Sequence, residues 1–120
     1  MSQLIVLAGI AEFATQAGRD ACLASSAKYQ APALTDKPGC LAYYFAPDPV
    51  VPTRMVVWEL WADSAALSAH FLHPNYRDMG AHLGKFGIVS AEFKKYRVDH
   101  VEPVYDATGK PRGDFFQLKA

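Results

Sequence analysis

The spacing of hydrophobic residues predicts alternating strands and helices along the chain. The first run, residues 4–10, is continuously apolar, which is typical of a strand covered on both faces. A helical segment then opens at Gly18-Arg19-Asp20 and carries apolar residues at spacings of three and four, namely Leu23, Ala27, Ala31 and Leu34. We expect Pro32 to kink or end this helix, because proline lacks a backbone donor.

Two more strands follow a firm helix stop at Lys37-Pro38-Gly39. In residues 40–46 a period of two places Leu41, Tyr43 and Phe45 on one face. In residues 55–61 it places Glu59 among apolar side chains, on the face of Met55, Val57 and Trp61. A proline-rich loop between the two segments favours an antiparallel hairpin with a long connection.

A second helical region follows, and it is predicted to break in two. Asp63 or Ser64 is expected to cap the first piece, on which Leu67, His70 and Phe71 share a face. Pro74 is well placed as the first residue of the second piece. Residues 92–101 then alternate between apolar and charged side chains, which predicts a fourth strand.

The predicted order is therefore β-α-β-β-α-β. This order favours a ferredoxin-like α+β sandwich with an antiparallel sheet and helices on one face. Because the first strand is apolar on both sides, the uncovered sheet face needs a partner, and we expect a homodimer that pairs the sheets. We assign residues 1–101 to this domain and residues 102–120 to a C-terminal extension, a turn followed by a strand or an arm laid on the partner.

Composition and charge exclude several classes of protein. Lysine plus arginine and aspartate plus glutamate are 12 each, so the formal net charge of the 120 residues is zero. No basic stripe suggests a nucleic-acid surface, and no apolar run is long enough to span a membrane. The N-terminus lacks the basic region of a signal peptide. Two cysteines without CxxC spacing fit a reduced, soluble, cytoplasmic protein.

Several blocks of residues resemble the antibiotic biosynthesis monooxygenase family, which includes quinol monooxygenases. These blocks are Lys37-Pro38-Gly39-Cys40-Leu41 with Tyr43, Trp58-Glu59-Leu60-Trp61, Ala65-Ala66-Leu67, Ala69-His70 and His73-Pro74-Asn75-Tyr76. Their order and spacing span roughly residues 4–100. The resemblance implies a dimeric α+β barrel with a substrate pocket in each protomer. It also implies oxidation of a phenolic or hydroquinone-like aromatic by O2, with no metal or other cofactor.

The resemblance makes His70 the candidate catalytic residue, as a base for the substrate. Trp61 and Tyr43 are expected to wall the pocket, with Glu59, Phe71 and Tyr76 as further substrate-binding candidates. Each has a structural alternative. His70 can be a satisfied core histidine, the aromatic residues can be packing residues, and Glu59 can pair with Arg54, Arg97 or a dimer mate.

Two other functions remain open on the sequence. The same barrel can bind a small apolar ligand without catalysis, or be filled by its own side chains. Haem-degrading relatives follow a sequence pattern with an asparagine in the first strand and a haem-ligating histidine after the broken helix. Here the first strand has no asparagine, and Gly80 stands at the ligand position with His82 turned away from it.

Overall fold

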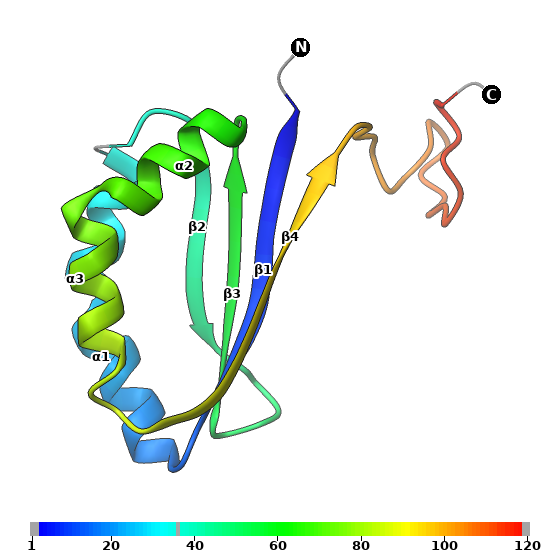
Figure 1. Ribbon diagram of the computed structural model, residues 1–120. Coiled ribbons are helices and arrows are strands. Elements are labelled where there is room, and N and C mark those ends of the chain that lie inside the picture. Colours follow the sequence, from blue (N-terminus) through cyan, green and yellow to red (C-terminus); the bar gives the residue numbers. More distant parts are fainter. Residues whose placement is uncertain (1–2, 36, 119–120) are drawn as a thin grey trace.

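A computed structural model describes residues 3–35 and 37–118. The elements in chain order are β1 (Leu4–Phe13), α1 (Gln16–Thr35), β2 (Cys40–Pro47), β3 (Arg54–Trp61), α2 (Ser64–Leu72), α3 (Pro74–Leu83) and β4 (Ile88–Val98). The strands form one antiparallel sheet in the order β2-β3-β1-β4, and the helices pack on one face of it (Figure 1). The predicted ferredoxin-like α+β fold, with its second helix broken into α2 and α3, is confirmed.

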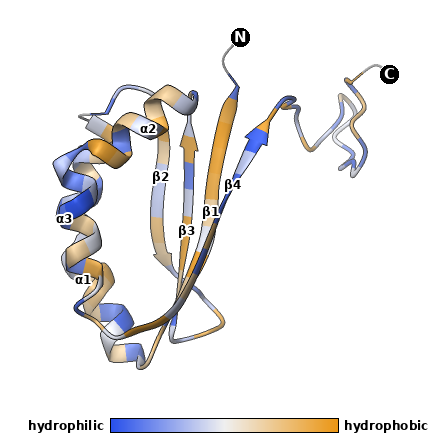
Figure 2. Ribbon diagram, viewed as in Figure 1, coloured by the Kyte–Doolittle hydropathy of each residue, from blue (hydrophilic) through white to orange (hydrophobic). Residues whose placement is uncertain are grey.

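Side chains alternate between an inner sheet face, toward the helices, and an outer face, away from them. On the inner face Met55, Val57 and Trp61 of β3 are buried, as the period of two predicts. On the outer face Trp58, between them in sequence, is 42% exposed. Strand β1 is hydrophobic along most of its length (Figure 2), so it supplies apolar side chains to both faces.

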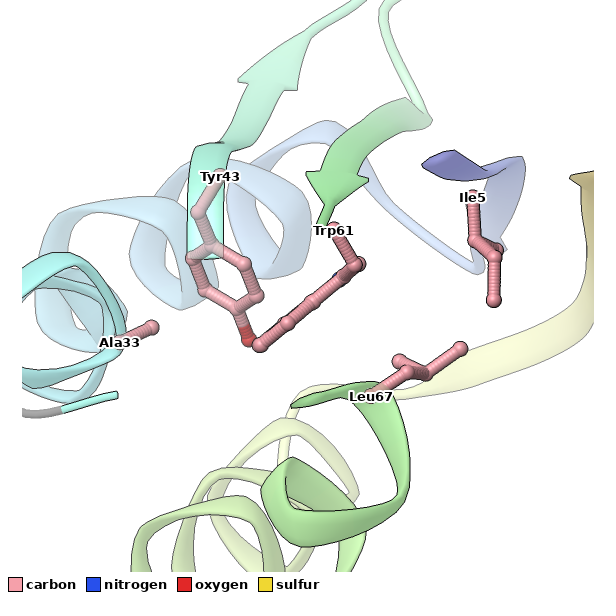
Figure 3. Close-up of a cluster of buried hydrophobic side chains, with 5 residues drawn as sticks. All are labelled: Ile5, Ala33, Tyr43, Trp61 and Leu67. Carbon is pink, nitrogen blue, oxygen red and sulfur yellow. The ribbon is translucent and has the colours of Figure 1, made fainter. Parts of the chain in front are cut away.

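The core between the sheet and the helices consists of two clusters of buried side chains. One joins Ile5, Ala33, Tyr43, Trp61 and Leu67. In Figure 3 the Tyr43 ring and the Trp61 indole of this cluster point into the space between α1 and α2. The other cluster joins Ala11, Phe13, Cys22, Met55 and Val57. The core therefore lies under the inner face, and the outer face is open in the single chain.

Helix α1 differs from its prediction in length and in the face that it buries. It begins at Gln16 and continues past Pro32 to Thr35. The proline is tolerated because it lies in the last turn, where only one backbone hydrogen bond is lost. The predicted stripe of Leu23, Ala27, Ala31 and Leu34 does not form the buried face, and Leu34 is half exposed. The buried residues are instead Arg19, Cys22, Ser26 and Ala33.

The predicted face of Leu41 is wrong, because β2 has a β-bulge at its start. Cys40 pairs with Trp61 and Ala42 pairs with Leu60, so Leu41 is one extra residue on β2. Leu41 is exposed, whereas Tyr43 is buried beyond the bulge. The last strand also shifts, because β4 occupies Ile88–Val98 rather than residues 92–101.

The chain after β4 forms a small structure that stands away from the sheet (Figure 1). The Glu102 carboxylate accepts hydrogen bonds from the amides of Phe116 and Gln117, at 2.8 Å and 3.3 Å. The β-pairing in this part, as far as residue 118, is an isolated bridge between Tyr105 and Pro111. Residues 115–118 do not form a strand, and the dimer arm remains a prediction. No helix in the described part of the chain is long and apolar enough to cross a membrane.

Candidate active site

The break between α2 and α3 places His70 and Tyr76 beside each other. The side chain of Asp63 caps α2 by accepting from the amide of Ala66 at 2.8 Å. At the end of α2, His73 caps α3 through Nδ1, and Pro74 occupies the first turn of α3. The chain therefore turns within two residues, and the His70 and Tyr76 rings meet edge to face, 5.1 Å between centroids.

Strand β3 brings Glu59 and Trp61 to the inner face below this break. Their side chains lie on the same side of the strand because they are two residues apart. The Trp61 Nε1–H donates to Oε1 of Glu59 at 3.0 Å, and the indole stacks at a tilt on the His70 ring, 4.6 Å between centroids. The indole therefore links the carboxylate of β3 to the imidazole of α2.

A cavity of about 590 Å³ opens between the inner sheet face and helices α2 and α3. This volume is in the usual range for small-molecule sites. Most of its wall is apolar or aromatic, while Glu59 and His70 are deeply buried polar groups in it, 4% and 2% exposed. The residues that line it are Leu7, Tyr43, Phe45, Val57, Glu59, His70, Phe71, Tyr76, Arg77, Met79, Gly80, Ala81, Leu83, Phe93, Lys94 and Lys95.

The predicted site residues fall into two groups in the structure. His70, Glu59, Tyr43, Phe71 and Tyr76 all line the cavity. Trp61 is fully buried in the core cluster, so it contacts His70 and Glu59 from behind rather than lining the cavity itself. The structural alternative that pairs Glu59 with Arg54 does not hold, because Arg54 pairs with Glu12 at the other end of β3.

Lys37 is a site residue that the sequence pattern did not reveal. It follows α1 and precedes Gly39, whose φ of +86° lies in the left-handed region. A Cβ on Gly39 would lie 2.6 Å from that of Ala66, so glycine lets this turn pack against α2. The Lys37 side chain is buried there, with Nζ 2.5 Å from Nδ1 of His70. In sequence, a lysine before Pro-Gly looks like an ordinary turn residue.

Burial shifts the pKa values of the polar groups in the cavity toward their neutral forms. Burial raises the pKa of Glu59 to about 7, although the Trp61 hydrogen bond and the Lys37 charge oppose the rise. Burial, followed by the charges of Lys37 and His73, lowers the pKa of His70 to about 4. Burial and the Glu59 charge raise the pKa of Tyr43. The imidazole is therefore neutral at pH 7, and the protonated form of Glu59 is favoured more than that of an exposed glutamate.

His82, His100 and Cys22 lie outside this arrangement. Nε2 of His82 is 2.7 Å from Oγ of Ser25, so its ring packs between α3 and α1 rather than in the cavity. Gly80, at the position of the haem ligand, lines the cavity without a ligating side chain. Cys22 is buried in the core, where burial raises its pKa to about 11. Among the described residues, no three His, Cys, Asp or Glu side chains are grouped to hold a metal.

Solved structures with the same fold cover most of the chain. A candidate antibiotic biosynthesis monooxygenase from Caulobacter crescentus CB15 matches with a TM-score of 0.73 and 21% identity, covering 84% of this chain and 92% of that one. A candidate monooxygenase of the same description from Chloroflexus aurantiacus J-10-fl matches with a TM-score of 0.64 and 25% identity, covering 83% and 97%. A conserved protein from Bacteroides thetaiotaomicron VPI-5482, described as a possible oxidoreductase, matches with a TM-score of 0.71 and 15% identity, covering 82% and 100%.

At the level of sequence, no curated protein matches the chain. The family model for antibiotic biosynthesis monooxygenases does match, over residues 7–81. That range runs from β1 through α3 and includes every residue that the sequence assigned to the site. The match covers more than half of the chain, and the chain belongs to the antibiotic biosynthesis monooxygenase family.

Proposed function

We propose that the protein is a monooxygenase that oxidises a phenolic or hydroquinone-like aromatic substrate with O2. Membership of the family supports a monooxygenase-like function. The observation that carries the substrate class is the cavity beside His70, with aromatic walls and two buried polar groups. A flat aromatic ring suits the walls, and a hydroxyl on that ring suits the two polar groups.

The reaction needs little more than a proton acceptor and a dry, shaped site. A phenol that has lost its proton is electron-rich enough to pass an electron to O2. For an anthrone-like substrate, one O2 enters, a ring CH2 becomes C=O and one H2O leaves, so the four electrons lost by carbon reduce the O2. The protein must therefore remove a proton, stabilise the resulting oxyanion and exclude water.

The charges around the cavity support a substrate that becomes an anion. Arg77 of α3 and Lys95 of β4 are cationic residues in the lining, and Lys37 lies behind His70. Glu59 is the carboxylate in the lining. Positive charge around the cavity lowers the free energy of a bound phenolate relative to the phenol.

Oxygen uptake with a panel of hydroquinones and anthrones tests this function. We expect wild-type protein to consume O2 with at least one compound, and His70→Ala to lose at least tenfold of that rate, since catalytic proton donors and acceptors contribute about 10²–10⁴. His100→Ala is the matched control, because His100 pairs with Glu102 in the C-terminal extension.

Equal rates for wild type and His70→Ala across the panel would remove His70 from the mechanism. Binding of the same aromatics without any O2 uptake would instead favour a non-catalytic binding protein. A Soret band that appears on addition of haem would favour haem binding.

A further inference from the structure

The contact between Lys37 and His70 determines which ring nitrogen of the imidazole carries the proton. Nζ of Lys37 is 2.5 Å from Nδ1 of His70. A lysine ammonium has three donors and no acceptor, so the nitrogen that it contacts must offer a lone pair. The proton of the neutral imidazole is then on Nε2.

This tautomer leaves His70 without a free lone pair for the substrate. A neutral imidazole accepts a proton only at its unprotonated nitrogen, which here is Nδ1, and the ammonium occupies that atom. Protonation at Nδ1 would also place two positive charges in contact inside a buried site, where charges interact more strongly than in water. His70 in this arrangement is a hydrogen-bond donor rather than a base.

Glu59 supplies the free acceptor that His70 lacks. Its Oε1 accepts from Trp61 at 3.0 Å, while Oε2 has no hydrogen-bond partner in residues 3–35 and 37–118. Every fully buried side-chain nitrogen or oxygen in that part of the chain has a partner. Oε2 of Glu59 and Nε2 of His70 are therefore open to the cavity that both residues line.

We propose that Glu59 is the base of the site, and that Lys37 positions His70 to donate its Nε2–H to the substrate oxygen that loses the proton. The assignment rests on the proposed function. In the proton transfer the substrate O–H bond breaks and an O–H bond forms on Oε2 of Glu59. The bonding electron pair stays on the substrate oxygen, where Nε2–H stabilises it, and O2 is the oxidant of the next step.

The electrostatics of Glu59 suit a base at neutral pH. Its pKa is raised to about 7 by burial, and proton transfer is most efficient when the pKa of the base is near the working pH. The titratable and charged side chains that surround it are Lys37 ahead of β2, Cys40 and Tyr43 on β2, His70 on α2, Tyr76 and Arg77 on α3 and Lys95 on the inner face of β4.

NMR of the histidine side chains tests the tautomer without any turnover. In ¹⁵N-labelled full-length protein at pH 7, we expect His70, assigned by comparison with His70→Gln, to carry its proton on Nε2. Lys37→Met should lose this preference, and Lys37→Arg should restore it, because arginine also offers only donors. A proton on Nδ1 in the wild type, or a spectrum unchanged in Lys37→Met, would overturn the positioning role of Lys37.

The pH dependence of kcat/KM for O2 uptake tests the base. With Glu59 as base, kcat/KM should rise with pH and level off above about 7. Glu59→Gln, which keeps the size of the side chain and an acceptor for Trp61, should lose about 100-fold. Glu59→Asp should recover part of that loss, and its kcat/KM should again rise with pH. Glu12→Gln is the control, because Glu12 pairs with Arg54 outside the cavity.

With His70 as base, the rise would be centred near pH 4, and Glu59→Gln would stay within a few-fold of the wild type. Either result overturns the role of Glu59, provided that circular dichroism shows the variant to be folded. Wild-type protein that consumes no O2 with any substrate would overturn the proposed function and the role of the base together. The tautomer of His70 would still be decided by NMR.

Discussion

At the residue scale, His70 and Glu59 are buried in the wall of the same cavity, and they have opposite effects on how stability depends on pH. The pKa of Glu59 is raised from 4.5 to about 7, so its contribution to stability is present below pH 4.5 and lost as the pH rises through 7. The pKa of His70 is lowered from 6.5 to about 4, so its contribution is present above pH 6.5 and lost as the pH falls through 4. Between pH 4.5 and 6.5 the two contributions oppose each other.

In the wild type the opposite pH dependences of these two contributions partly cancel. A substitution at either residue should therefore reveal a pH dependence of stability that the wild type hides. Glu59→Gln removes the Glu59 contribution, and we expect its free energy of unfolding relative to the wild type to rise by about 3 kcal/mol from pH 4.5 to 7. His70→Gln removes the His70 contribution, and we expect its free energy of unfolding relative to the wild type to fall by about 3 kcal/mol from pH 4 to 6.5. Urea denaturation at several pH values measures both, and a difference from wild type that does not change with pH would contradict the burial of these groups.

At the scale of single elements, helix α1 packs one face against the core and also holds the loop between β2 and β3 in place. Its buried face contains the charged residue Arg19, whose NH1 donates to the carbonyls of Asp48, Val51 and Arg54 at 3.2–3.3 Å. The same guanidinium donates to the carboxylate of Asp20. Arg19 thus donates to three carbonyls of the β2–β3 loop and the first residue of β3, and it joins that loop to the first turns of α1.

Arg19→Leu should lower the free energy of unfolding by about 2–3 kcal/mol, because the carbonyls of Asp48, Val51 and Arg54 lose a charged donor. Arg19→Lys should recover only part of this, since an ammonium is a single group and lacks the separate guanidinium nitrogens that donate to the carbonyls and to Asp20 at once. Urea denaturation measures both. Lys28→Leu, on an exposed part of α1, is the control, and an equal loss there would show that the loop anchor is not the cause.

At the scale of the whole molecule, the outer sheet face is open and mostly apolar over β1, β2 and β3, while β4 adds the ion pair of Glu92 and Lys94. Tyr44, Trp58 and Tyr96 are exposed on it, next to the outward side chains of β1. We propose that a second copy of the chain covers this face and that two sheets pack into a dimeric α+β barrel. The formal net charge of zero leaves little repulsion against self-association.

Trp58→Lys should convert the proposed dimer to a monomer, since it places a charge at the centre of the face. Sedimentation velocity over a range of concentrations measures the change. Leu72→Lys is the matched control, because Leu72 is exposed on α2, on the helical side of the sheet. Deletion of residues 103–120 should weaken the dimer if the extension forms an arm. A wild-type protein that is monomeric at all concentrations would contradict the pairing of the sheets.

The order of elements, the broken second helix, the starts of its two pieces and the inner face of β3 could all be predicted from the sequence. Each depends on residues that are close in the chain. Period two placed Glu59 with Trp61, and the Asp63 and Pro74 positions placed the ends of α2 and α3. The family blocks likewise brought His70, Tyr43 and Tyr76 to one site. Local hydrogen bonding and side-chain periodicity carry this information.

The tertiary structure alone decided which groups meet. Helix α1 buries Arg19 and Ser26 because loop carbonyls and packing partners that are distant in sequence determine which of its faces is buried. The apolar residues of the helix itself do not determine that face. The bulge at Leu41 depends on the pairing of two strands. Lys37 and His70 are 33 residues apart, and no pattern in the chain predicts their contact. The sequence by itself therefore determined the elements and most of the cavity wall, whereas long-range packing decided the tautomer of His70 and with it the proposed division of roles in the site.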